Sequence, residues 1–206
     1  MTLRKVYHLF TNIESLPTLP LRAFSDADWA GNPDDRTSTS AYLVYLGNCL
    51  VSWKSFKQKS VARSSTEAEY RALASAAAEL AWIQSLLHEM LLPLSESPPT
   101  LYCDNVGATY LSANPVFHSR MKDSAIDFHF VRERVQNGLL RVLHVSSADQ
   151  LADALTKPLP KTRFLALRHK LCVSSGQNMN HKRKYLLNQS QEYQWKYQLS
   201  KEESFQ

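Results

Sequence analysis

Four acidic residues lie far apart in this sequence, yet each stands beside a segment expected to be buried. Asp26 ends an apolar run that begins at Leu21, and Asp104 directly follows Leu101-Tyr102-Cys103. Glu69 lies in the first turn of a long alanine-rich segment, on its buried side, and Asp153 lies among the apolar residues 151–155. A buried carboxylate is costly unless a positive charge meets it. We therefore expect the four to converge and to bind a divalent metal.

Magnesium is the ion that best suits such a cluster. Two carboxylates about 4 Å apart repel by roughly 4 kcal/mol at an effective dielectric constant near 20. Mg²⁺ takes hard oxygen ligands and keeps open positions for water and phosphate oxygens. Two ions about 3.5–4 Å apart can activate a water molecule and stabilise the leaving oxygen of a phosphodiester. We expect two Mg²⁺ ions as the cofactor, with Mn²⁺ as a substitute.

The first half of the chain predicts a strand, a hairpin and a long helix. The strand covers residues 21–29, and strands at 41–46 and 49–56 are joined by Gly47-Asn48, a two-residue loop typical of a hairpin. Residues 64–66 are candidate N-caps of a helix that extends to about Leu92. Its apolar stripe, with spacings of three and four residues, comprises Leu73, Ala77, Leu80, Gln84, Leu87 and Leu91. Glu69 lies on this stripe, one turn before Leu73, and Glu67 does not.

The second half alternates short strands and helices. The predicted strands are 100–103 and 139–145, and the predicted helices are 106–111, 125–136, 149–155 and 161–171. This order predicts an α/β fold with a mixed central sheet and helices on both faces. Ligand sites in such sheets lie beyond the carboxyl ends of parallel strands, where Asp26 and Asp104 are expected.

Composition limits the remaining classes. The 206 residues suit one domain at 21–173, with a lead-in at 1–20 and a polar, disordered tail at 174–206. The net charge of +5 favours a polyanionic partner only weakly. Three scattered cysteines include no C-x-x-C pair, which argues against a structural zinc site or a disulfide framework. We expect an intracellular, cytoplasmic protein, with the nucleus as the alternative, and no membrane association, since neither a signal peptide nor a spanning segment is present.

Five ordered motifs resemble one known family. Between about Leu21 and Val173, the chain is similar to the ribonuclease H domain of copia-type long-terminal-repeat retrotransposon Pol polyproteins. The motifs are Phe24-Ser25-Asp26-Ala27-Asp28-Trp29-Ala30-Gly31, Val51-Ser52-Trp53, Ala62-Arg63-Ser64-Ser65-Thr66-Glu67-Ala68-Glu69-Tyr70, Tyr102-Cys103-Asp104-Asn105 and Ala152-Asp153-Ala154-Leu155-Thr156-Lys157.

The resemblance implies a ribonuclease H-like fold and a function. Members of the family cleave the RNA strand of RNA–DNA hybrids endonucleolytically with a divalent metal. Their catalytic, metal-binding carboxylates correspond to Asp26, Glu69, Asp104 and Asp153. The resemblance also implies the reverse transcriptase part of the same polyprotein as a partner. That part is absent from this chain, because the one Asp-Asp pair, Asp34-Asp35, follows Asn32-Pro33 in a turn and forms no Tyr-x-Asp-Asp motif.

Two rival functions follow from the same residues. Ala41 stands where the family usually has glycine, and residues 118–127 also depart from its pattern. These differences favour, as the alternative, a catalytically inactive nucleic-acid-binding remnant. An integrase or transposase core would share the fold but orders its acids Asp, Asp, Glu. Here the glutamate is second in the chain, which favours ribonuclease H.

Several neighbouring residues have competing interpretations. Lys54, Lys57 and Arg63 could contact substrate phosphates, or could form a solvated face with Lys59. Trp53 is expected to pack in the core rather than to stack on nucleic acid. His144 is either a mobile histidine that helps product leave or a structural strand residue.

Three acids also have plainer interpretations. Glu67 fits a favourable charge at a helix N-terminus. Asp104 could also be the N-cap of the following helix, and Asp153 could belong to the polar face of a short helix.

Overall fold

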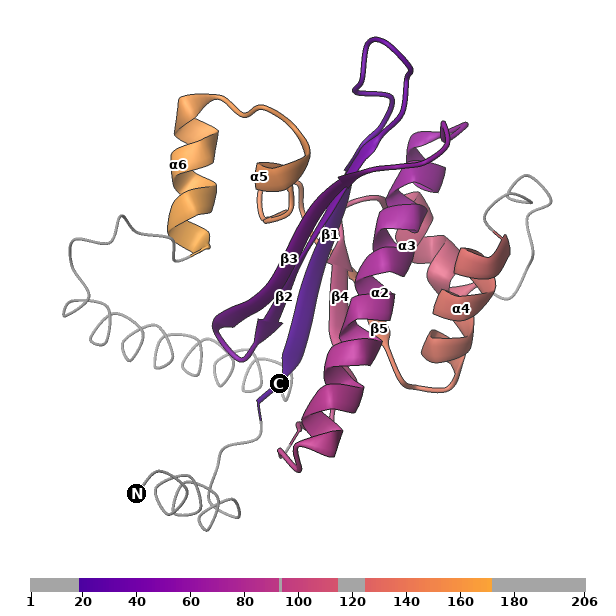
Figure 1. Ribbon diagram of the computed structural model, residues 1–206, viewed down its shortest axis with the longest axis vertical. Coiled ribbons are helices and arrows are strands. Elements are labelled where there is room, and N and C mark those ends of the chain that lie inside the picture. Colours follow the sequence, from indigo (N-terminus) through magenta and orange to yellow (C-terminus); the bar gives the residue numbers. More distant parts are fainter. Residues whose placement is uncertain (1–18, 93, 115–124, 172–206) are drawn as a thin grey trace, which may run out of the picture. The chain divides into compact units, whose positions relative to one another are not determined.

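The computed structural model describes residues 19–92, 94–114 and 125–171. Its centre is a five-stranded sheet in the order β3-β2-β1-β4-β5 (Figure 1). The strands are β1 Leu21–Asp28, β2 Thr39–Leu46, β3 Cys49–Lys57, β4 Thr100–Cys103 and β5 Arg141–His144. The first three strands pair antiparallel, whereas β4 pairs parallel with both β1 and β5. Gly47, with a φ of 60°, forms the predicted tight turn between β2 and β3.

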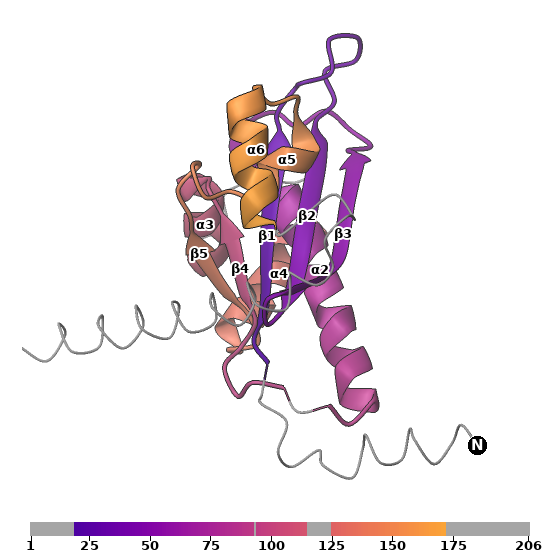
Figure 2. The ribbon, with the colours of Figure 1, turned by 90° about the vertical axis from the view of Figure 1, so that its left-hand side faces the viewer.

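Helices cover both faces of this sheet (Figure 2). They are α2 Ser65–Glu89, α3 Val106–Ala113, α4 Ala125–Gln136, α5 Asp153–Thr156 and α6 Lys161–Lys170. The main apolar core lies between the sheet and α2, α3 and α4. A second core, which contains Leu43, Tyr45, Leu151 and Leu167, joins the opposite face to α6 and the chain around α5. The predicted α/β fold, with a mixed sheet and helices on both faces, is confirmed.

Helix α2 begins as its sequence predicts. The hydroxyl of Ser64 accepts a hydrogen bond from the backbone N–H of Glu67 at 3.1 Å, which satisfies one of the free donors of the first turn. The stripe that contains Leu73, Ala77, Leu80 and Leu87 is buried against the sheet. The helix ends at Glu89, three residues before the predicted end, and Leu91 adopts a positive φ of 56° and is exposed.

Glu67 lies in the first turn of α2, as predicted for a charge at a helix N-terminus, and its side chain is buried. Its carboxylate lies 2.6 Å from the guanidinium of Arg71, one turn further along α2. It also accepts a hydrogen bond from the backbone N–H of Arg63 at 2.8 Å. The paired cation permits the burial of this acid, and Glu67 is thereby committed to holding the start of α2.

The remaining element bounds differ from the predictions by a few residues. Helix α5 is shorter than predicted and begins at Asp153, because turns at residues 147–149 and 151–152 precede it. Residues 1–18 and 172–206 lie outside the described residues, so the lead-in and the polar tail stay predictions. Within the described part of the chain, no helix combines the length and apolar character that crossing a membrane requires.

Candidate metal centre

Two of the predicted acids meet because β1 and β4 are adjacent and parallel. Phe24 of β1 stands opposite Tyr102 of β4, so the next residues of both strands run toward the same edge of the sheet. Asp26 lies two residues beyond this pair, and Asp104 directly follows β4. Asp26 is almost fully buried, with 2% of its surface exposed, whereas Asp104 is half-buried. The topology thus places both carboxylates at the carboxyl edge, as expected for a ligand site.

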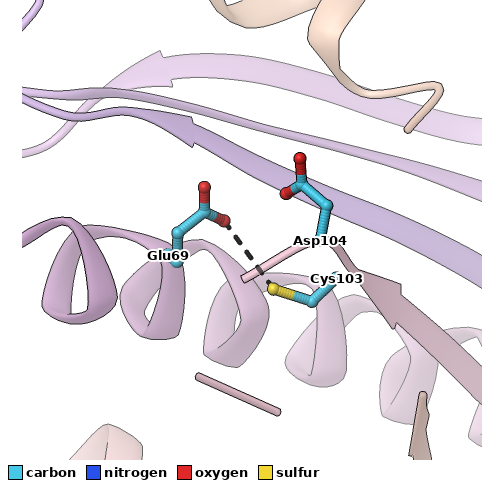
Figure 3. Close-up of side chains that lie close together, drawn as sticks. All are labelled: Glu69, Cys103 and Asp104. Atoms are coloured by element: carbon cyan, nitrogen blue, oxygen red, sulfur yellow. Dashed lines mark hydrogen bonds between the residues drawn. The ribbon is translucent and has the colours of Figure 1, made fainter. Parts of the chain in front are cut away.

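Glu69 reaches the same edge from α2. Its carboxylate, the thiol of Cys103 and the carboxylate of Asp104 each offer a ligand atom, and these atoms lie within 4.8 Å of one another (Figure 3). The thiol donates a hydrogen bond to Glu69 Oε2 at 3.8 Å. Burial, followed by the charges of Asp26 and Asp104, raises the pKa of Glu69 to about 9. Without a cation, Glu69 therefore holds a proton at neutral pH.

Asp153 joins Asp26 from the other side of the sheet. The hydroxyl of Thr156 donates a hydrogen bond to Asp26 Oδ2. Lys157 Nζ lies 2.7 Å from Asp153 Oδ1 and 4.0 Å from Asp26 Oδ2, and Arg163 donates a hydrogen bond to Asp153 Oδ2 at 3.2 Å. Burial raises the pKa of Asp26 to about 6, although Thr156 and Lys157 oppose the shift. Burial lowers the pKa of Lys157, but its carboxylate partners outweigh burial and the net shift is upward.

Asp26 links the two halves of this cluster, which are the Glu69–Asp104 pair and Asp153. Its charge interacts with those of Asp104 and Asp153, and it shares a side-chain hydrogen bond with Glu69. Asp26 therefore interacts with each of the other three acids, whereas the ligand atoms that lie within 4.8 Å of one another are those of Glu69, Cys103 and Asp104. The roles of the four acids as metal ligands and catalytic residues stay predictions.

The plainer interpretations of Asp104 and Asp153 are wrong. Asn105, rather than Asp104, caps α3, because its side chain accepts a hydrogen bond from the N–H of Ala108 at 2.9 Å. Asp104 instead accepts a hydrogen bond from the Ser147 hydroxyl at 2.9 Å. Asp153 is buried, with 5% exposed, and so belongs to no solvated helix face. Both carboxylates thus remain available to the cluster.

His144 lies beside the cluster at the end of β5. It is exposed, and its Nε2 lies 3.2 Å from the backbone oxygen of Asp104. The alternative was a satisfied structural histidine in a strand, and the position of His144 in β5 with this contact agrees with it. Its part in product release stays a prediction.

The predicted substrate-binding cations lie on β3 and before α2. Lys54 stands over the Phe56 ring at 5.1 Å, and Lys57 pairs with Asp35 at 2.6 Å. Arg63 is exposed just ahead of α2. Trp53 is a correction, because it is 62% exposed rather than packed in the core. Since β3 is an edge strand, one flank of Trp53 has no neighbouring strand to cover it.

Sequence reasoning missed the groups that surround the acids. Thr156 and Lys157 stand in the last of the five motifs, and that proximity to Asp153 was the available signal. Cys103 likewise precedes Asp104 directly. Arg163 gave no signal, because its contact with Asp153 depends on how α6 packs against the sheet.

The donor set fits a hard divalent cation. Four carboxylates converge, and among the described residues only Lys157 and Arg163 pair with them as cations. Burial raises the pKa of the Cys103 thiol, so this sulfur stays protonated and donates to Glu69 instead of binding a soft metal. Carboxylate oxygens in excess of cations are the environment that Mg²⁺ and Mn²⁺ prefer.

Two plant retrotransposon proteins show where such a segment occurs. The chain is 61% identical over 157 residues to the retrovirus-related Pol polyprotein from transposon RE1 of Arabidopsis thaliana. These matched residues make up 76% of this chain. The chain is homologous to one segment of retrotransposon Pol polyproteins. The polyprotein from transposon TNT 1-94 of Nicotiana tabacum is 39% identical over 144 residues, or 70% of the chain. In each case the matched segment is 11% of the polyprotein's length.

Solved ribonuclease H domains are among the structures to which the chain is similar. Among solved structures, the N-terminal ribonuclease H domain of a Mycobacterium tuberculosis protein, fused to maltose-binding protein, is 14% identical with a TM-score of 0.49. That match covers 74% of this chain and 98% of the solved chain. No protein-family model matches the sequence.

Proposed function

We propose that this Pol segment is the ribonuclease H part of a copia-type polyprotein and that it cleaves the RNA strand of RNA–DNA hybrids endonucleolytically. The observation that carries the proposal is the convergence of Asp26, Glu69, Asp104 and Asp153 at one edge of the sheet, with more negative than positive charge. These four carboxylates would hold Mg²⁺ or Mn²⁺. When bound there, the metal lowers the pKa of the attacking water and stabilises the departing 3′ oxygen.

The protein's own hydroxyl and thiol groups orient three of the four carboxylates. The Cys103 thiol directs Glu69 Oε2, the Ser147 hydroxyl directs Asp104, and the Thr156 hydroxyl directs Asp26. Each donor fixes one oxygen of its carboxylate, and Glu69 is held further by the backbone N–H of Ala27 and by Asp26. Such fixed orientation is what a metal site requires of the residues behind its ligands.

A hybrid substrate would reach this edge of the sheet along β3. Lys54 and Lys57 lie on that strand and Arg63 lies before α2, so these exposed side chains are proposed to contact the phosphate backbone. Discrimination of RNA from DNA would come from contacts to 2′-hydroxyls in the shallow minor groove. The reverse transcriptase part of the same polyprotein is proposed as a further partner, as the resemblance of the motifs implies.

Cleavage of a labelled hybrid tests the proposed function. We expect the purified chain to cut the RNA strand in the presence of Mg²⁺, and to leave duplex DNA and the DNA strand of the hybrid intact. EDTA should stop the reaction, and Asp104→Asn should abolish it, because one charge and one ligand oxygen are lost while the shape is kept.

Turnover indistinguishable from that of Asp104→Asn would contradict the proposal. Salt-sensitive hybrid binding without cleavage would instead identify the inactive nucleic-acid-binding remnant.

A further inference from the structure

The two halves of the acid cluster differ in their compensation by cations. Asp153 pairs with Lys157 at 2.7 Å and with Arg163 at 3.2 Å, and Lys157 also lies 4.0 Å from Asp26. Within residues 19–92, 94–114 and 125–171, neither Glu69 nor Asp104 pairs with a cation. A metal that binds Glu69 and Asp104 therefore displaces the proton of Glu69 but no basic side chain, whereas one that uses Asp153 meets cations already present.

The two basic side chains at Asp153 are anchored differently. Arg163 also donates hydrogen bonds to the backbone oxygens of Ser147 and Ala148, the latter at 2.7 Å, so it is fixed independently of the carboxylate. Both partners of Lys157 among the described residues are carboxylates, and 39% of its side chain is exposed. An ammonium group on a flexible four-carbon stem can swing into solvent without breaking any other contact.

We propose that Lys157 is a built-in competitor of the divalent cation: it neutralises Asp26 and Asp153 in the metal-free protein and must leave when these carboxylates bind the metal. This inference rests on the metal centre of the proposed function and adds a residue that sets its affinity. A compact ammonium group and a divalent ion seek the same carboxylate oxygens, and close like charges repel strongly. Arg163 stays in place and continues to orient Asp153.

Unequal binding of two ions follows from this competition. At the Glu69–Asp104 side an ion displaces the Glu69 proton but no basic side chain, so Lys157 opposes only an ion that uses Asp26 or Asp153. Binding that uses Asp153 is weaker by the free energy needed to release Lys157. Removal of the ammonium group should therefore tighten the weaker binding event and leave the stronger one nearly unchanged.

Calorimetric titration of the full chain with MnCl₂ or MgCl₂, without nucleic acid, tests the competition. For Lys157→Met we expect the dissociation constant of the weaker event to fall roughly tenfold, the scale of one close like charge in a partly solvated site. The matched control is Lys161→Met, which makes the same change at an exposed residue that begins α6. It should bind both ions like the wild type.

Chemical labelling of the wild-type chain gives a second measurement, which needs no variant to fold. Acylation followed by mass spectrometry should label Lys157 several-fold faster after metal is added, with labelling of Lys161 unchanged. Unchanged or weaker metal binding by a folded Lys157→Met variant, or unchanged labelling of Lys157, would overturn the inference. So would the absence of metal binding by any variant.

Failure of the inference is distinguishable from failure of the proposed function. Tighter metal binding by Lys157→Met without hybrid cleavage by any variant would uphold the competition and reject the nuclease. Hybrid cleavage by the wild type, combined with a metal affinity that Lys157→Met leaves unchanged, would reject the competition and uphold the nuclease.

Discussion

Glu69→Gln should lower the rate of hybrid cleavage on the order of a thousandfold, or about 4 kcal/mol of transition-state stabilisation, and at the same time stabilise the metal-free fold. The loss of activity follows from the loss of a ligand charge. The gain in stability follows because Glu69 is buried beside Asp26 and Asp104, and its ionised form is disfavoured there. A neutral amide keeps the acceptor for the Cys103 thiol and can donate to Asp26.

Urea denaturation in EDTA and single-turnover cleavage measure the two effects. We expect Glu69→Gln to raise the free energy of unfolding at pH 7 on the order of 2 kcal/mol. The matched control is Glu89→Gln, the same change at an exposed position near the end of α2, which should alter neither quantity. A variant that is both less stable and fully active would show that Glu69 is a structural acid.

The metal-free protein should lose stability as the pH rises from about 5 to about 9. The pKa of Glu69 is raised from 4.5 to about 9 in the folded state, so between these values the folded protein keeps a proton that the unfolded chain has released. The free energy of unfolding then falls by up to about 1.4 kcal/mol per pH unit. Asp26, with its pKa raised to about 6, acts in the same direction over the acidic part of this range.

Urea midpoints at pH 5.5, 7 and 8.5, with and without Mg²⁺, measure this dependence. Saturating Mg²⁺ should flatten or reverse it, because the metal binds the deprotonated carboxylates. Glu69→Gln should flatten it in EDTA. Asp35, whose pKa is lowered to about 2, acts in the opposite direction only at pH values below this window. Two results in EDTA would contradict the burial of Glu69 beside Asp26 and Asp104. One is a free energy of unfolding that rises with pH, and the other is an unchanged pH dependence of that free energy in Glu69→Gln.

The secondary structure was predictable because local signals agreed with the packing. Ser64 caps a helix whose apolar stripe repeats every three or four residues, and Gly47-Asn48 joins two strands in a tight turn. The acids were predictable for a related reason. Asp26 and Asp104 end runs of buried strand residues, and adjacent parallel strands bring their carboxyl ends together.

The contacts that the sequence did not reveal all depend on packing between distant elements. Glu67 was expected as a charge at a helix N-terminus, and its burial depends on an ion pair with Arg71 that a period-based pattern does not weigh. Arg163 reaches Asp153 only because α6 packs over the sheet. Trp53 alternates as a core residue would, but its strand lies at the sheet edge, and strand order is not encoded in local pattern.

Anomalous X-ray scattering from crystals soaked in MnCl₂ tests the shared metal centre most directly. We predict manganese peaks within coordination distance, about 2.0–2.3 Å, of carboxylate oxygens of Asp26, Glu69, Asp104 and Asp153, with Lys157 turned away from Asp153. Manganese bound only at exposed acids such as Asp35 or Asp149, with the four carboxylates empty at saturating concentration, would contradict the metal centre and the nuclease proposed from it.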